Sequence, residues 1–320
     1  MRLCVKFLIL GMVFAVATGA GVYLAIPYLW QSGPMRDLTT VIGDPKRGKY
    51  VARLGGCFAC HTDVKNNGIP MAGGRVIKTP FGDFRTPNIT SDSETGIGGW
   101  SLADFMQAMT NGLRPDGNHY YPAFPYASYS KMNTKDIADL KAYLDTVPPA
   151  YNEIADHDLR FPFNIRRGLS VWKLLHFSPQ AWANNLEKSK EWNRGAYIVN
   201  GPGHCVECHT PRTLMGGLDT EHHLKGAAKG PNGERIPDIS ANSESGIGNW
   251  SNGDFLFLLK MGLTPEGDVV GGAMADVVQS STAHYSKQDL KAVIKYLKDS
   301  STPRRTHPYA NNLKSLFYMD

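Results

Sequence analysis

The sequence predicts an all-α fold, in which two tandem helical units with long loops follow one N-terminal transmembrane helix. Three observations predict it: the chain opens with an apolar run, a pattern of about 100 residues occurs twice, and each copy has helical segments at both ends with Gly- and Pro-rich segments between them. We expect five parts: a membrane anchor or signal peptide, a first unit, a connecting segment, a second unit and a C-terminal tail, at residues 1–31, 40–150, 151–188, 189–302 and 303–320.

The N-terminal run from Phe7 to Ile26 carries no charge over twenty residues, about the length of a bilayer-spanning helix. Arg2 and Lys6 precede it, and tyrosine and tryptophan gather at its far end, as in an aromatic belt. A single span in this orientation would leave the rest of the chain outside the cytoplasm. The alternative is a cleaved signal peptide with small residues at the cut site. Because the apolar run continues past those small residues, a retained anchor is favoured.

The internal repeat is read from two long matches. "RTPNITSDSETGIGGWSLADF" starts at Arg85 and "RIPDISANSESGIGNWSNGDF" starts at Arg235, with an ungapped offset of 150 residues. Upstream, "RGKYVARLGGC" from Arg47 matches "RGAYIVNGPGHC" from Arg194. The same helices are therefore expected in both units.

Each unit is expected to begin and end with a helix. The first helices are predicted at about residues 44–54 and 191–199, and the last at about 134–145 and 287–298. Asp44 followed by Pro45 is typical of a helix start. In the last helix of the second unit, apolar residues recur on one face. The long loops between these helices suit a domain whose core is largely a prosthetic group.

The motif C-x-x-C-H occurs twice and uses four of the five cysteines: Cys57, Cys60 and His61 in the first unit, and Cys205, Cys208 and His209 in the second. A redox dithiol needs no histidine after it, and a zinc site would leave both histidines unexplained. C-x-x-C-H is the attachment motif of c-type haem, in which two thiols bind the vinyl groups and the histidine ligates the iron. The sequence therefore predicts two covalently bound haem c groups.

Composition excludes other classes of protein. The formal net charge of the 320 residues is +5, without a basic stripe interleaved with aromatic residues, so nucleic-acid binding has no support. Scarce spare cysteines fit an oxidising compartment.

The R-G-x-Y segments, the "TPNIT" loop, the G-I-G-x-W turns and "YPAFPYASY" resemble class I cytochrome c domains, in the multi-haem form found as cytochrome subunits of bacterial alcohol, gluconate and molybdenum-hydroxylase dehydrogenases. This chain has no third motif, so the resemblance is to two-haem members. It implies that the first helix of each unit crosses the last, through Gly48 and Tyr50 over Tyr143, and through Gly195 and Tyr197 over Tyr296.

The sixth iron ligands are expected to differ between the two units. Met274 lies 24 residues after Trp250, where such domains supply a methionine. The same count from Trp100 reaches Phe124, which cannot ligate iron. Met132, His119 or water is left for the first iron. Methionine ligation would raise the potential and favour electron transfer.

The resulting hypothesis is an electron-transfer subunit rather than an enzyme in its own right, anchored in the bacterial inner membrane with its haem domains in the periplasm. It would pass electrons from a dehydrogenase to a quinone, a soluble cytochrome or an oxidase in the respiratory chain. The alternatives are a terminal-oxidase subunit, or a haem enzyme or gas binder with an open first iron. Five further expectations concern single residues. Arg85 and Arg235 would pair with haem propionates, Trp100 and Trp250 would pack near the porphyrins, His222 and His223 would be solvated, and His204 would pack beside the haem. Residues 162–182 would join the units; a second membrane contact there is the less favoured alternative, because Arg166, Arg167 and Lys173 interrupt the apolar run.

Overall fold

A computed structural model describes residues 33, 35–230 and 233–300, together with positions 18, 19, 21 and 25. Among these residues no helix is long and apolar enough to cross a membrane. The predicted span from Phe7 to Ile26 and the predicted tail at 303–320 fall almost wholly outside the described residues and stay predictions. The division into units at residues 40–150 and 189–302 also stays a prediction.

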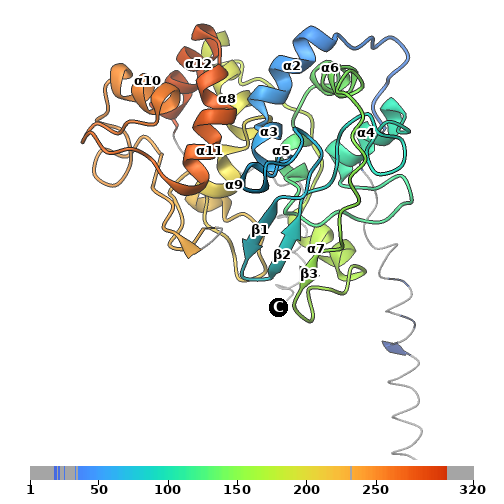
Figure 1. Ribbon diagram of the computed structural model, residues 1–320. Helices are drawn as coiled ribbons and strands as arrows, with labels where there is room; N and C mark the ends of the chain where they lie inside the picture. Colours follow the sequence, from blue (N-terminus) through green and yellow to red (C-terminus); the bar gives the residue numbers. More distant parts are fainter. Residues whose placement is uncertain are drawn as a thin grey trace, which may run out of the picture.

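The described chain is largely helical (Figure 1), as expected. Its α-helices are α2 (Pro45–Leu54), α3 (Cys57–Cys60), α4 (Leu102–Asn111), α5 (Tyr126–Tyr129), α6 (Thr134–Leu144), α7 (Gly168–His176), α8 (Lys190–Asn200), α9 (Cys205–His209), α10 (Asn252–Met261), α11 (Gly272–Ser280) and α12 (Lys287–Leu297). Short 3₁₀ turns are η2 (Val64–Asn66), η3 (Thr220–His222) and η5 (Thr282–His284). The strands are β1 (Val76–Thr79), β2 (Gly82–Arg85) and β3 (Asp158–Leu159).

The caps of these helices repeat between the units. Ser101 and Ser251 each accept a hydrogen bond from the backbone three residues later, and an aspartate there bonds back, forming capping boxes at α4 and α10. Asn133 and Ser286 cap α6 and α12, and the side chain of each accepts a hydrogen bond from the backbone N–H three residues later. Equivalent short polar side chains therefore start equivalent helices.

The first and last helices of each unit cross in contact, α2 with α6 and α8 with α12. Glycine makes both crossings possible. A Cβ atom on Gly48 would lie 1.8 Å from the Asp139 carbonyl oxygen, and one on Gly195 would lie 1.9 Å from that of Ala292. The crossings implied by the family resemblance are thus present in both units.

A small antiparallel sheet departs from the all-α expectation. β1 pairs with β2, and β2 pairs with β3 of the connecting segment, in the order β1-β2-β3. Gly82 makes this pairing possible, because a Cβ there would lie 2.4 Å from the Asp158 carbonyl oxygen. In the second unit only an isolated bridge, Ala227 with Ile236, is described at the corresponding place. The pairing of β3 joins segments more than 70 residues apart, which local patterns do not reveal.

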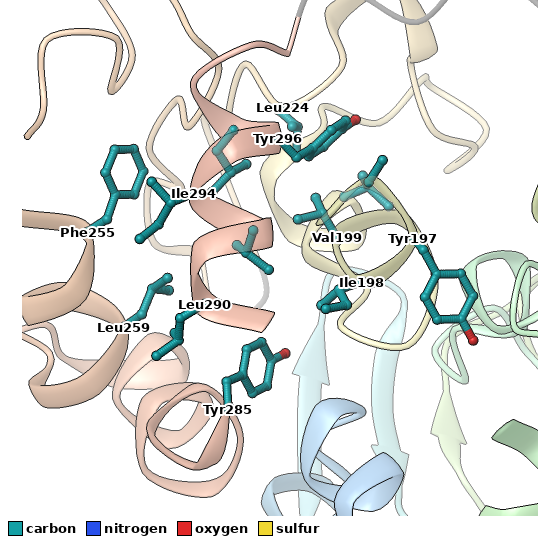
Figure 2. Close-up of a cluster of buried hydrophobic side chains, with 14 of the residues drawn as sticks. Tyr197, Ile198, Val199, Leu224, Phe255, Leu259, Tyr285, Leu290, Ile294 and Tyr296 are labelled. Carbon is teal, nitrogen blue, oxygen red and sulfur yellow. The ribbon is translucent and has the colours of Figure 1, made fainter. Parts of the chain in front are cut away.

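Two large buried clusters form most of the core, beside two smaller ones around Tyr126 and Phe84. One collects residues of the first unit, from Val51 to Leu144. The other, shown in Figure 2, brings together side chains from α8, α10 and α12. Leu54, at the end of α2, belongs to this second cluster although it lies in the first unit. The two units therefore share part of their core.

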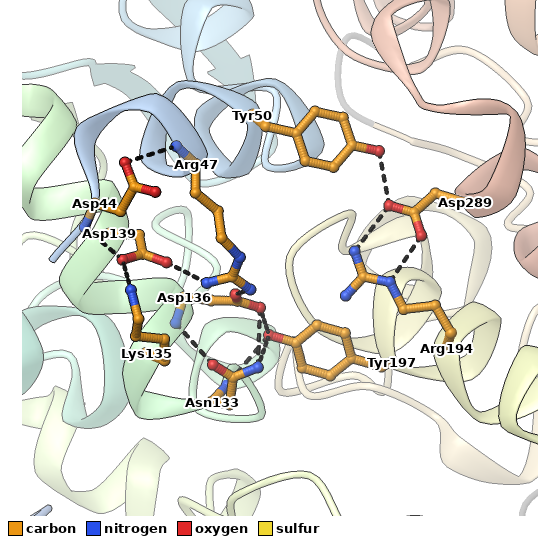
Figure 3. A network of polar contacts seen from close by, with 10 residues as sticks. All are labelled: Asp44, Arg47, Tyr50, Asn133, Lys135, Asp136, Asp139, Arg194, Tyr197 and Asp289. Atoms are coloured by element: carbon orange, nitrogen blue, oxygen red, sulfur yellow. Dashed lines mark hydrogen bonds and ion pairs between the residues drawn. The ribbon is translucent and has the colours of Figure 1, made fainter. Parts of the chain in front are cut away.

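A polar network joins the units by a reciprocal exchange (Figure 3). Tyr50 of α2 donates to Asp289 of α12 at 2.7 Å, and Tyr197 of α8 donates to Asp136 of α6 at 2.5 Å. Each aspartate also pairs with an arginine of its own unit, Arg47 for Asp136 and Arg194 for Asp289. Burial beside Asp136 raises the pKa of Tyr197, so its phenol keeps the proton that it donates. Equivalent tyrosines thus bond the partner unit rather than their own.

Replacing Gly195 by alanine should cost about 3 kcal/mol or more in the free energy of unfolding, because α8 and α12 would have to separate. Guanidinium unfolding followed by far-UV circular dichroism measures this. Gly168→Ala is the matched control, since a Cβ there meets nothing within 4 Å. It should change stability by less than about 1 kcal/mol. Equal stability of the two variants would show that the crossing is not tight.

Tyr197→Phe should destabilise the protein by about 1.5–3 kcal/mol, because Asp136 is only 1% exposed and loses a hydrogen-bond donor. The control is Tyr151→Phe, whose ring is 64% exposed. The same unfolding measurement applies, and a loss no greater than the control's would contradict the role given to this bond.

Candidate functional site

The first C-x-x-C-H motif forms the short helix α3 directly after α2. The turn between them uses Gly56, whose φ of 61° lies in the left-handed region. His61 follows α3, and its Nδ1 lies 2.8 Å from the carbonyl oxygen of Pro87. Burial lowers the pKa of His61, which favours the neutral imidazole that ligates iron.

The second motif repeats this geometry. α9 carries Cys205, Cys208 and His209, and His204 takes the left-handed turn position with a φ of 37°. Nδ1 of His209 lies 2.9 Å from the carbonyl oxygen of Pro237. Burial lowers the pKa of this imidazole as well.

The proline carbonyls decide which ring nitrogen is available. A neutral imidazole that donates its Nδ1–H to a carbonyl keeps its Nε2 lone pair for a metal, and such a partner also holds the ring in orientation. The motif alone did not reveal these partners. The signal was in the sequence: Pro87 and Pro237 sit in the repeated "TPN" and "IPD" segments.

The four thiols fit covalent attachment. All are free and partly buried, so none is consumed by a disulfide. Burial raises the pKa of Cys57 and of Cys205 to about 12 each, so these thiols are protonated at neutral pH. A thiol that carries its proton matches the addition of S–H across a vinyl group. The residues present therefore fit one haem c per motif.

The two motifs lie close together across the contact between the units. His204, next to Cys205, reaches the carbonyl oxygen of Gly55 at 3.2 Å and packs against the ring of Tyr129. Burial raises the pKa of Cys208 to about 11, and the negative charge of the adjacent Glu207 adds to the rise. His204 was expected beside the haem; its described contacts are with the other unit.

Two links join the units near the motifs, and we call them the cross-braces. Each connects the segment in which one unit's distal ligand is expected to the motif of the other unit. Arg75 donates to the Ala59 carbonyl within the first motif at 2.5 Å and to Asp276 of α11 at 2.6 Å. Ser128 of α5 donates to Glu207 of α9 at 2.6 Å. The helix that contains Met274 also packs against α3. Sequence patterns gave no sign of these bonds, since neither has a repeated counterpart.

The repeat alignment behind Met274 is maintained in the backbone. Bridges join Leu113 to His119 and Leu263 to Val269, and the next residues, Tyr120 and Val270, each donate to a glycine carbonyl at 2.8 Å. Equivalent residues of the two units are therefore 150 positions apart as far as Tyr120 and Val270, which lie four residues before Phe124 and Met274. Met274 lies half-buried on α11.

The first unit has an aromatic cluster where the second has Met274. Phe124 packs edge-on against Tyr120, Tyr126 and Tyr129. Met132 is 1% exposed and belongs to the buried cluster that Cys57 and Phe58 contact.

His119 lies in a different environment from Met132. Its half-buried ring has a pKa lowered to about 4 by burial and by the nearby Lys173 of α7. Met132 thus lies with the first motif, whereas His119 lies with the connecting segment. The assignment of a sixth ligand in this unit stays a prediction.

The remaining expectations have mixed outcomes. Nε of Arg85 is buried and has no hydrogen-bond partner among the described residues, which fits the expected pairing with an anionic group. Arg235, by contrast, is exposed. Trp100 and Trp250 pack against the two cores. His222 is exposed, but the expectation that His223 is solvated is wrong: its ring bonds Tyr296, and burial lowers its pKa to about 4.

Residues 162–182 contact both units, and on the first unit Lys173 donates to the carbonyl oxygens of Asn111 and Gly112. Trp172 donates to the Met215 carbonyl at 2.9 Å, and Trp182 packs against Tyr197. Leu174 and Leu175 are both more than half exposed.

Comparison with known proteins agrees with this site. Residues 45–148 match the Cytochrome c family model. The chain is 41% identical over 289 residues to a protein of Cereibacter sphaeroides named diheme cytochrome c-type, covering 88% of this chain and 94% of that protein. It is 41% identical to the cytochrome c subunit of the quinone alcohol dehydrogenase of Gluconobacter oxydans and 36% identical to the cytochrome subunit of the fructose dehydrogenase of Gluconobacter japonicus. Those alignments cover 79% of this chain but only 54% and 51% of the relatives.

The mass of the protein produced in a haem-maturing host should exceed that of the polypeptide by two haems. Replacing Cys57 and Cys60 together by alanine should remove one haem, and Cys4→Ala should remove none. Mass spectrometry under denaturing conditions reads the number of attached groups. A wild-type excess of one haem would contradict the assignment of both motifs.

Proposed function

This chain belongs to the cytochrome c family, and we propose that it carries electrons through two covalent haems from a periplasmic dehydrogenase to the respiratory chain. The relatives that match most of this chain are a di-haem cytochrome and cytochrome subunits of dehydrogenases. We propose further that it is not itself the site of substrate oxidation. Its partner would be the dehydrogenase, and its acceptor a quinone, a soluble cytochrome or an oxidase.

One observation carries this proposal: the two motifs lie against one another at the contact between the units. His204 and Gly55 touch across it, beside Cys205 and Cys57 respectively. Groups attached at neighbouring helices would be close enough to exchange electrons without a moving carrier. Separate sites at opposite ends of the chain would instead suit two independent functions.

The protein's own residues would hold and adjust these groups. Cys57, Cys60, Cys205 and Cys208 would bind them covalently, with His61 and His209 as proximal ligands. When bound, each haem supplies a one-electron Fe(III)/Fe(II) couple. Pro87 and Pro237 hold the imidazoles in orientation and tautomer, which raises their basicity toward the metal.

We propose the bacterial inner membrane as the location, with residues 7–26 as a single span and the haem-binding units in the periplasm. The uncharged length of that run and the basic residues before it support this placement. Covalent haem attachment outside the cytoplasm fits it.

Spectra of Met variants test the carrier function. An electron carrier should show two low-spin ferric signals, because both of its irons would have a protein side chain as sixth ligand. Met274→Ala should remove one thioether-to-iron charge-transfer band and lower the potential of one haem. Met132→Ala should remove a second band if Met132 ligates the first iron. Met215→Ala, at a 62% exposed side chain, is the control and should change neither band.

A high-spin ferric signal in the wild type would contradict the carrier assignment and favour ligand binding or haem catalysis at the first iron. Phe124→Met is then informative, because it should convert that signal to low spin if the position faces the iron.

A further inference from the structure

Helix α7 has a buried side that carries polar groups and an exposed side that is apolar. Its inner side, Leu169, Ser170 and Lys173, is buried against the first unit. Its outer side carries Leu174 and Leu175, which are 55% and 51% exposed. A surface helix ordinarily turns polar residues outward and apolar residues inward, and α7 reverses this pattern.

Lys173 fixes which side faces inward. Its ammonium group donates to the carbonyl oxygens of Asn111 and Gly112 at 2.6 and 2.8 Å, at the C-terminal end of α4. It also lies 4.7 Å from the centre of the Tyr126 ring. Because these contacts hold the inner side in place, the leucines cannot turn inward without breaking them.

The outer side of α7 continues into two neighbouring segments. The turn before α7 adds Phe163, whose ring packs edge-on against Phe81 at the tip of the β1-β2 hairpin. The loop at 213–217 reaches the same place, where Gly216 lies beside Phe81 and Trp172. We call the resulting surface the apolar end face; its exposed residues are Phe161, Phe163, Leu174, Leu175, Leu214 and Met215, between 46% and 100% exposed.

The chain at Gly33 lies close to α7. The Gly33 amide donates to Asn111 at 2.9 Å, the residue whose carbonyl accepts from Lys173 of α7. Only six residues separate Gly33 from Ile26, the last residue of the uncharged run. Six residues span at most about 24 Å, so Gly33 stays within that reach of whatever holds the run, and α7 lies one residue, Asn111, beyond Gly33.

Charge at the rim of the face is mostly positive. Arg160 and Arg167 are exposed on either side of the 161–165 turn and Arg166 is half-buried there, with Asp156 and Asp158 as exposed acids nearby. Aromatic and leucine side chains with flanking arginines are the composition of protein segments that lie in a membrane interface and contact anionic headgroups.

We propose that the apolar end face rests in the outer surface of the bilayer, so that α7 and the 161–165 turn are a second membrane contact beside the N-terminal span. The inference rests on the anchor proposed above. Its consequence is a fixed orientation: the haem-binding units are held at a set height and rotation relative to the membrane, instead of turning freely on a tether.

A lipid-borne photolabel tests this with the full haem-loaded chain. The protein is reconstituted in phosphatidylglycerol–phosphatidylcholine vesicles that contain a photoactivatable phospholipid, floated on a density gradient and analysed by peptide mass spectrometry. Peptides spanning 160–175 and 212–218 should be labelled several-fold more than α10. The α10 face is the matched control because Leu256, Phe257 and Met261 are 41–61% exposed and lie at the other end of the molecule (Figure 1).

Variants distinguish a stable contact of the apolar end face with the membrane from random collision with lipid. Leu174→Glu with Leu175→Glu should reduce labelling of 160–175 several-fold, whereas Leu256→Glu with Phe257→Glu should leave it unchanged. Arg160→Gln with Arg167→Gln should reduce it on anionic vesicles and serves if the leucine variant does not fold, as judged by its haem spectrum.

The outcomes distinguish this inference from the proposals above. Failure to float overturns the anchor and leaves electron transfer untouched. Flotation with α7 unlabelled, or labelled no more than α10, overturns the membrane contact alone. If α7 is unlabelled in vesicles but protected from deuterium exchange in native membranes that contain its dehydrogenase, the face binds protein, and the inference is likewise overturned.

Discussion

The close approach of backbones at Gly48 and Gly195 is the constraint on which the remaining architecture depends. Because no side chain separates α2 from α6 or α8 from α12, each pair of helices crosses at a fixed depth. That depth brings Tyr50 and Tyr197 to the edge of their own unit, from which each reaches an aspartate of the other. The same crossing directs the ends of α2 and α8 toward the short motif helices. Core, interface and site are therefore consequences of two helix contacts.

Local patterns predicted those features that a few neighbouring residues decide. Asp44 with Pro45, the G-I-G-x-W turns and C-x-x-C-H each specify a helix start, a turn or a ligand set within a dozen residues. The pairing of β3 with β2, the exchange by Tyr50 and Tyr197, and the cross-braces depend on segments distant in the chain. The repeat shows that Tyr50 and Tyr197 are equivalent, but it does not show that each of them bonds the other unit. The carbonyl partners of His61 and His209 are an intermediate case, visible as repeated prolines but without an assigned role.

The two units differ most in the distal segment. α11 has nine residues and carries Met274, whereas α5 has four and is preceded by Phe124 in an aromatic cluster. Aromatic rings that pack edge-on in this place add packing energy. Since α5 is also tied to α9, this packing bears on the surroundings of the second motif. Residues of both units therefore contribute to the difference between the two sites.

The cross-braces also bear on how such a repeat evolves. Arg75 with Asp276, and Ser128 with Glu207, are unlike pairs at non-equivalent positions, so the two copies of the unit are no longer interchangeable. A copy of either unit placed in the other's position would carry the wrong partner at each bond. If recombination copied the sequence of one unit over the other, the copied unit would lose these bonds. They diverge as a matched pair, and each residue of a brace is expected to vary together with its partner.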